Sequence, residues 1–167
     1  MDIVAAEAPT REAELLADLG AMLIHAGRLD EARAALGRAS ERDPKNARVL
    51  ANLAVATLKQ QDLQGAELHA TRALALDPTL GRALEVIGEV RLDRGDAAGA
   101  LPYLARAVKA KPDDAAALFY LGVAYERLGR SAQACAVWRQ VLAVPGIAQG
   151  VRALTTRQSA AAGCAGL

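Results

Sequence analysis

Few side chains in this sequence have the types and spacing that catalysis or metal binding requires. The two histidines, His25 and His69, belong to no HExxH motif and have no cysteine at a metal-ligand spacing. The two cysteines, Cys135 and Cys164, form no CxxC motif, and a cysteine nucleophile would need a neighbouring base. We expect Cys135 to be a packing residue and Cys164 to lie in a C-terminal tail. These patterns predict a protein that is not an enzyme and that uses neither a metal nor a cofactor.

Phosphate, nucleic-acid and membrane chemistry are also poorly represented. The glycines of residues 95–99 follow no predicted strand, so this segment is interpreted as a turn between helices and not as a phosphate loop. The chain has 20 Lys+Arg and 19 Asp+Glu, with acids interleaved among the arginines, which predicts no nucleic-acid binding. Uncharged runs such as residues 115–125 are much shorter than the roughly 20 residues that span a membrane, so no membrane insertion is expected.

The expected location is cytoplasmic. No leader-like segment is recognised at the N-terminus. A disulfide-stapled secreted domain is disfavoured, because only two cysteines are present.

The composition favours helices. Hydrophobic residues make up 53% of the chain but aromatic residues only 3%. The apolar residues are mostly Ala and Leu, which have the highest helix propensities, whereas the β-branched and aromatic residues that strands prefer are scarce. The sequence therefore predicts an all-α fold with enough apolar side chains for a core.

An internal period of 34 residues is visible first in the prolines. Pro44, Pro78 and Pro112 lie 34 residues apart. At this period the chain divides into blocks that start at residues 13, 47, 81 and 115. The fourth, eighth and twentieth residues of the blocks recur as Leu, a small residue and Ala: Leu16, Leu50, Leu84 and Leu118; Gly20, Ala54, Gly88 and Gly122; Ala32, Ala66, Ala100 and Ala134.

Each block has the pattern of two helices joined by a turn. Positions 4, 7 and 11 share one helical face, and positions 20, 24 and 27 share a face of a second helix. The small residue at position 8 is expected to face the Ala at position 20, which would let the helices approach closely. The proline at position 32 ends the second helix, because it pushes the preceding residue out of the α region.

This pattern resembles the tetratricopeptide repeat, whose period is also 34 residues. The resemblance implies a right-handed α-solenoid of four helix hairpins within residues 10–146, at 13–46, 47–80, 81–114 and 115–146. Residues 147–160, with Ile147, Val151 and Leu154 on one face, are predicted to form a capping helix. Residues 1–9 are expected to be flexible, with Thr10 as the cap of the first helix, and residues 161–167 are expected to form a tail.

By resemblance to the family, the first helices of the hairpins line a concave peptide-binding groove. The residues at its groove-facing positions are Ala17, Ala21, Ile24, Ala51, Asn52, Val55, Leu58, Glu85, Glu89, Leu92, Phe119, Tyr120, Val123 and Glu126. Family members that bind chaperone tails clamp a carboxylate with Lys and Asn where this chain has Ala17 and Ala21, so a cochaperone role of that type is disfavoured. The first half of the groove is mainly apolar and suits a helix or extended peptide with apolar anchors.

The second half of the predicted groove leaves alternatives open. Glu85, Glu89 and Asp93 form an acidic stripe that would favour a basic ligand, or a solvated face balanced by neighbouring arginines. Phe119 is either a binding hot spot or a residue that fills space between repeats.

The function predicted is non-catalytic protein–protein interaction, as an adaptor or scaffold that binds a peptide or helix in the groove. One alternative is a holding chaperone for secreted or pilus subunits. A second is a self-assembling scaffold, that is, a homo-oligomer. A third is an enzyme or enzyme subunit that depends on His25, His69 or Cys135.

Overall fold

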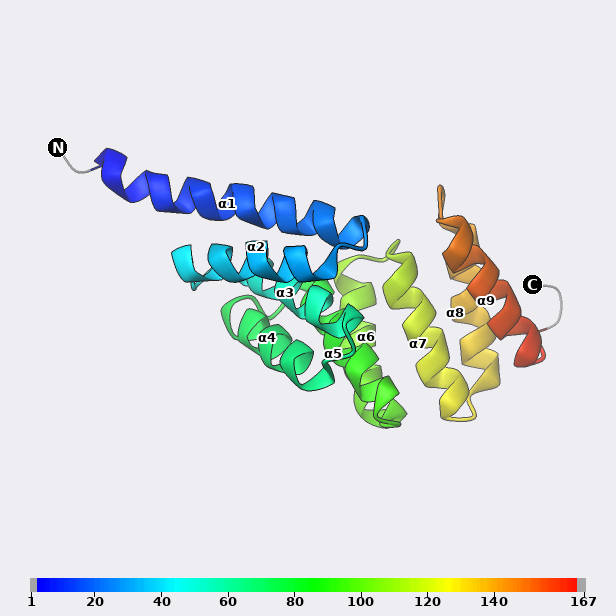
Figure 1. Ribbon diagram of the computed structural model, residues 1–167. Coiled ribbons are helices and arrows are strands. Elements are labelled where there is room, and N and C mark those ends of the chain that lie inside the picture. Colours follow the sequence, from blue (N-terminus) through cyan, green and yellow to red (C-terminus); the bar gives the residue numbers. More distant parts are fainter. Residues whose placement is uncertain (1–2, 165–167) are drawn as a thin grey trace. The chain divides into compact units, whose positions relative to one another are not determined.

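The computed structural model describes the backbone of residues 3–164 and the side chains of residues 11–164. These residues form helices and no strand (Figure 1). The helices are α1 Ile3–His25, α2 Leu29–Arg42, α3 Ala47–Lys59, α4 Leu63–Leu76, α5 Gly81–Asp93, α6 Ala97–Ala110, α7 Ala115–Arg127, α8 Ser131–Ala143 and α9 Gln149–Ala161. The predicted fold class, all-α and built from helix hairpins, is confirmed.

The chain divides into two compact units, one up to Val86 and one from Ile87 on, and α5 belongs partly to each. In the N-terminal unit α1 packs against α2, α3 against α4, and α3 also against α1 and α2. In the C-terminal unit α7 packs against α6 and α8, and α9 packs against both α7 and α8. Helices α3, α5 and α7 begin at Ala47, Gly81 and Ala115, the first residues of three predicted blocks.

Left-handed backbone ends the first helix of each hairpin. Gly27, Gly95 and Gly129 have φ between 71° and 80°, and in the second hairpin Gln61 takes the same conformation with φ 65°. The next residue's N–H then bonds to a carbonyl five residues back, as from Asp96 N–H to Arg91 O at 2.8 Å. This is the helix-ending geometry that glycine adopts at least cost.

The small residue at position 8 leaves room for a large side chain at position 24, which the sequence pattern did not predict. A Cβ on Gly20 would lie 2.4 Å from Leu36 Cγ, and one on Gly122 would lie 2.2 Å from Trp138 Nε1. The space beside Gly88 is similarly filled by the side chain of Leu104. Leu36, Leu104 and Trp138 occupy position 24 of their blocks and are completely buried. The space at position 8 therefore admits the large side chain at position 24.

The N-terminal helix differs from its prediction. Helix α1 begins at Ile3, so Pro9 and Thr10 lie inside it and Thr10 is not its cap. Residues 5–8 are Ala, Ala, Glu and Ala, which are strong helix formers and extend the helix backwards.

The predicted C-terminal helix exists but buries a different face. Ile147 and Val151 pack against the cluster that contains Trp138, whereas Leu154 is 46% exposed. Thr155 and Ser159 are buried in its place. Their hydroxyls donate to Val151 O at 2.7 Å and Thr156 O at 2.9 Å, so burial leaves neither hydroxyl without an acceptor.

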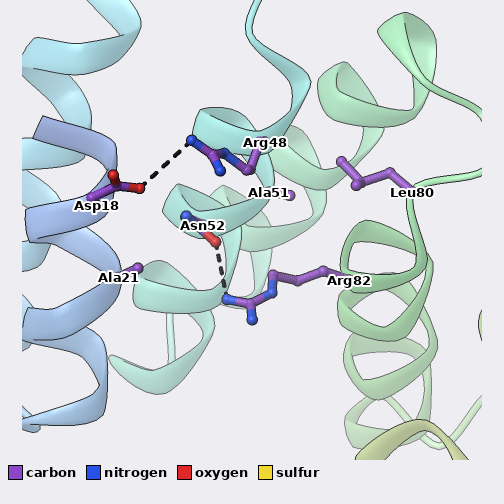
Figure 2. Close-up of a pocket in the computed structure, with 7 residues that line it drawn as sticks. All are labelled: Asp18, Ala21, Arg48, Ala51, Asn52, Leu80 and Arg82. Atoms are coloured by element: carbon purple, nitrogen blue, oxygen red, sulfur yellow. Dashed lines mark hydrogen bonds and ion pairs between the residues drawn. The ribbon is translucent and has the colours of Figure 1, made fainter. Parts of the chain in front are cut away.

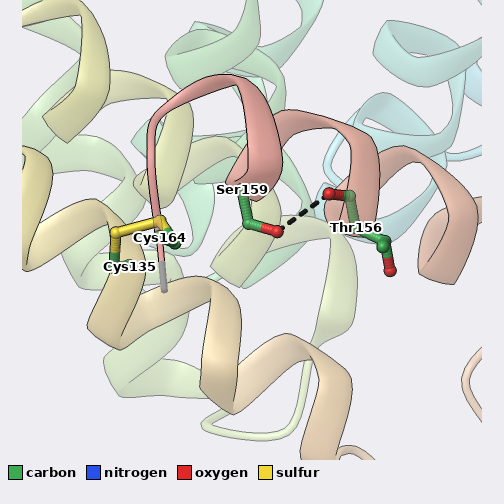
Figure 3. The surroundings of a disulfide bond; sticks show 4 residues. All are labelled: Cys135, Thr156, Ser159 and Cys164. Carbon is green, nitrogen blue, oxygen red and sulfur yellow. Dashed lines mark hydrogen bonds between the residues drawn. A yellow bond between two sulfur atoms is a disulfide. The ribbon is translucent and has the colours of Figure 1, made fainter. Parts of the chain in front are cut away.

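The predicted roles of the two cysteines are wrong. Cys135 in α8 and Cys164, just after α9, form a disulfide with their Cα atoms 5.5 Å apart (Figure 3). The bond joins residues 29 apart in sequence and fastens the end of α9 to α8. Residues 161–164 of the predicted tail are consequently attached to the hairpin, and residues 165–167 lie outside the described residues.

Candidate functional site

A pocket of about 330 Å³ opens in the N-terminal unit, between α1, α3 and the start of α5 (Figure 2). Its lining residues come from three parts of the chain: Asp18 and Ala21 in α1, Arg48, Ala51 and Asn52 in α3, and Leu80 and Arg82 around the start of α5. Ala21 and Ala51 have short side chains, which leaves this volume open between the longer polar side chains.

The start of α3 fixes one wall of the pocket. Asn46 caps this helix, with its Oδ1 accepting from the N–H of Val49 at 3.2 Å. From that start, Arg48, Ala51 and Asn52 fall at i, i+3 and i+4 and therefore lie on one helical face.

A turn before α5 positions Leu80 and Arg82 on the side of the pocket opposite α3. The backbone N–H and the hydroxyl of Thr79 both donate to Asp77 Oδ1, at 2.9 and 2.7 Å. These hydrogen bonds hold the pKa of the Asp77 carboxyl below its ordinary value, so the turn keeps a charged acceptor. Helix α5 begins soon after this turn, and Leu80 and Arg82 at its start reach the pocket.

The pocket combines polar and apolar side chains and carries an excess of positive charge. Arg82 Nη1 donates to Asn52 Oδ1 at 3.0 Å, and Asn52 is only 6% exposed. Arg48 Nη2 lies 3.6 Å from Asp18 Oδ1, but both side chains are largely exposed, so this ion pair contributes little to stability. Figure 2 shows Asn52 between the two arginine side chains.

The two guanidinium groups can also contact a ligand. Each has five N–H donors in a planar fork, more than its partner in the pocket uses. Two arginines against one aspartate give a local charge of about +1. This donor set matches a carboxylate or the carbonyl groups of a peptide backbone.

The pocket brings together three of the predicted groove residues, Ala21, Ala51 and Asn52. Ala51 and Asn52 are themselves 1% and 6% exposed and contribute through the pocket that they line. Other predicted groove residues are as deeply buried and do not line this pocket: Ala17, Ile24, Leu58, Leu92 and Val123. Val55 is partly buried against the cluster that contains Ile24. The apolar side of the predicted groove is therefore mostly packing surface.

The remaining predicted residues lie on α5 and α7. Glu85, Glu89 and Glu126 are partly buried, whereas Asp93, the third residue of the predicted acidic stripe, is exposed. Phe119 and Tyr120 contact edge to face, with ring centroids 5.5 Å apart, and both pack against the Trp138 cluster. Trp138 Nε1 also donates to the backbone carbonyl of Phe119 at 3.2 Å. The packing of Phe119 against this cluster favours its space-filling interpretation.

Sequence reasoning missed Asp18, Arg48, Leu80 and Arg82. Arg48 and Arg82 both occupy the second position of consecutive blocks, and this recurrence was the signal that could have identified them. Asp18 stands at position 6 of its block, as the predicted groove residue Asn52 does in the next block, so the repeat also offered a signal for it. Leu80 carries no comparable signal, because its place in the pocket depends on how separate segments pack.

The candidate catalytic residues lie outside the pocket. His25 is exposed near the end of α1, and His69 is half-buried in α4. Burial, followed by the charges of Arg72 and Arg33, lowers the pKa of His69, and its Nδ1 is buried without a hydrogen-bond partner. Among the described side chains, those of residues 11–164, no three His, Cys, Asp or Glu gather in a way that could hold a metal ion.

Comparison with known proteins supports this repeat architecture. The family model described as tetratricopeptide repeat matches residues 10–80 and 86–146. No curated protein sequence matches the chain. No helix in the described part of the chain is both long enough and apolar enough to cross a membrane.

Several solved structures share the fold. PilF of Pseudomonas aeruginosa is 20% identical, with a TM-score of 0.75 over 96% of this chain and 79% of its own. A thermophilic TPR protein of Thermus thermophilus is 24% identical, with a TM-score of 0.75 over 95% and 84% of the two chains. YrrB, described as a TPR protein with an unusual peptide-binding site, is 20% identical, with a TM-score of 0.65 over 97% and 84%.

Proposed function

The chain belongs to the tetratricopeptide repeat family, and we propose that it is an adaptor or scaffold that binds a segment of a partner protein at the pocket between α1, α3 and α5. Repeats of this family form protein-interaction surfaces from stacked hairpins. The observation that carries the proposal is the placement of Asn52 and Arg82 in an open pocket, where an amide and a guanidinium are held together at 3.0 Å.

The pocket's chemistry suggests a ligand with an acidic group beside a small apolar one. Arg48 and Arg82 can donate to a carboxylate, while Ala21, Ala51 and Leu80 supply apolar contacts. Asn52 can bond to the ligand backbone. This differs from the basic ligand suggested by Glu85 and Glu89, because the arginines lie in an open pocket and the two glutamates are partly buried.

A peptide library tests this proposal. Immobilised peptides that vary acidic, basic and apolar residues independently would be incubated with the purified chain. We expect selection of peptides that place Asp or Glu next to an apolar residue. Arg82→Glu should weaken this selection at least about tenfold, which corresponds to about 1.4 kcal/mol.

The matched control is Arg139→Glu, which makes the same charge change at an exposed position on α8. It should leave the selection unchanged. If the two variants bind alike, or if basic peptides are selected, the pocket is not the binding site.

The disulfide between Cys135 and Cys164 is relevant to the cellular compartment of the protein. Disulfides are rare in reducing compartments, so the cytoplasmic location expected from the sequence predicts free thiols at Cys135 and Cys164 in the cell. An oxidising compartment predicts the bonded form that the structure contains. Alkylation of freshly lysed cells, followed by mass spectrometry of the two cysteine peptides, distinguishes these locations.

A further inference from the structure

Helix α1 exposes a row of large apolar side chains. Leu15, Leu19 and Met22 are 66%, 46% and 69% exposed. Their spacing of i, i+4 and i+7 places them on one side of the helix. The other large exposed apolar residues of the described chain, Leu68, Leu76 and Leu154, are spread over α4 and α9. Large apolar side chains that are exposed together on one side of a helix are a feature of interaction sites.

This row continues into a hollow between α1 and α2. The hollow measures about 260 Å³, and its apolar lining consists of Leu16, Leu19, Leu23, Ala34 and Ala35. Leu19 belongs to both the row and the hollow. Glu31 and Arg38, both on α2, complete the lining. We name this surface the α1–α2 face and define it by Leu15, Leu19, Met22, Glu31, Ala34, Ala35 and Arg38.

The charges on the α1–α2 face are arranged symmetrically about its small residues. Glu31 lies three residues before Ala34, and Arg38 lies three residues after Ala35. If two copies of α2 cross antiparallel at Ala34 and Ala35, Glu31 meets Arg38 of the partner subunit, and Arg38 meets the partner subunit's Glu31. The alanines allow this approach because small side chains reduce the distance between helix axes.

The present contacts of Glu31 and Arg38 still allow each of them to pair with a second copy. Glu31 pairs with Arg28 at 2.5 Å, and Arg38 lies 3.6 Å from Glu12. The side chains of Glu31 and Arg38 are 57% and 63% exposed. A carboxylate accepts about four hydrogen bonds and a guanidinium donates five, so both can take an additional partner.

We propose that the α1–α2 face is a homodimer interface that packs against the same face of a second copy about a two-fold axis. A second copy fits because the face carries one charge of each sign at matched distances from its centre, which is the self-complementarity that a two-fold contact requires. A peptide that carried only positive or only negative charges would be repelled by either Arg38 or Glu31. The site lies outside the binding pocket of the proposed function and does not depend on it.

Two charge-reversal variants test the two-fold contact. Glu31→Arg and Arg38→Glu each place like charges opposite one another in a homodimer, so each protein alone should be monomeric. In an equimolar mixture, both charge pairs are restored between the two variants. We therefore expect wild-type protein to dimerise at micromolar concentrations, and the mixture to form a heterodimer that native mass spectrometry resolves by mass.

A second pair of variants tests the apolar row. Met22→Glu should shift the sedimentation of the protein to that of a monomer, and Leu68→Glu on α4 should leave the dimer intact. Circular dichroism would verify that all variants are helical. A wild-type chain that sediments as a monomer up to about 200 µM, or folded charge variants that stay monomeric when mixed, would overturn the proposal.

Discussion

At the scale of single residues, the size match between positions 8 and 24 explains how the hairpins close. Gly122 leaves the space that Trp138 fills, and Gly20 leaves the space that Leu36 fills. In the second block these positions hold Ala54 and Ala70, so a larger residue at position 8 accompanies a smaller one at position 24. Both alanines are fully buried. The small side chain of Ala70 at position 24 is therefore matched by the larger residue at position 8 of the same hairpin.

Gly122→Ala should destabilise the protein by about 1–3 kcal/mol, because the new methyl group would force the buried Trp138 ring to move. Urea unfolding followed by tryptophan fluorescence measures this change. Gly37→Ala in α2 is the matched control, since its added Cβ has no neighbour within 4 Å. That variant should gain about 0.5–1 kcal/mol from helix propensity. Equal stabilities for the two variants would contradict the packing explanation.

His69 should make stability depend on pH. Its pKa is lowered in the folded state by burial and by Arg72 and Arg33, against a raising effect of Asp62, whereas in the unfolded chain it returns to about 6.5. The unfolded state then binds more protons below pH 6.5, so stability is full above that pH and declines as the pH falls through the folded-state value.

His69→Gln should remove this contribution. As the pH is lowered from 7 to 5, the free energy of unfolding of the variant should increase relative to that of wild type. Chemical unfolding at each pH measures this difference. Parallel curves for wild type and His69→Gln would argue against the effect.

At the scale of helices and loops, the sequence predicts elements better than it predicts their contacts. The starts of α3, α5 and α7 follow from a period whose proline and leucine positions have a direct backbone or packing cause. The start of α1 was placed too late, because Pro9 and Thr10 outweighed the helical propensity of the alanines before them. The buried face of α9 was misassigned because Thr155 and Ser159 satisfy their hydroxyls within the helix and can be buried.

At the candidate site, too, the sequence predicts positions in the repeat better than contacts between helices. Ala21, Ala51 and Asn52 were found by position in the repeat, but Arg48 and Arg82 were not. An arginine on a helix is usually solvated, and only the packing of α1, α3 and α5 places these two around Asn52. The pairing of Cys135 with Cys164 likewise depends on how α9 folds back, which no local motif encodes.

The disulfide is expected to stabilise the C-terminal unit. A cross-link between residues 29 apart lowers the entropy of the unfolded chain by an amount worth about 3–4 kcal/mol at room temperature. Reduction should therefore lower the melting temperature and increase hydrogen exchange in α9 before the rest of the unit. The double variant Cys135→Ser/Cys164→Ser should not respond to reductant. Identical wild-type melting with and without reductant would show that the bond contributes little.

At the scale of the whole molecule, the net charge of +1 gives no long-range attraction toward partners of either sign. Specificity must therefore come from local groups. The pocket in the N-terminal unit supplies a local positive charge, and the α1–α2 face supplies paired opposite charges. One surface is suited to a different protein and the other to a second copy.

The most direct test of the account is a double-mutant cycle between Arg82 and the acidic residue of a selected peptide, measured by isothermal titration calorimetry. The cycle combines wild type and Arg82→Ala with the peptide and its alanine variant. We predict a coupling energy of about 1.5–3 kcal/mol, the value of a hydrogen bond to a charged group. A coupling energy near zero, with both proteins folded, would contradict binding in this pocket.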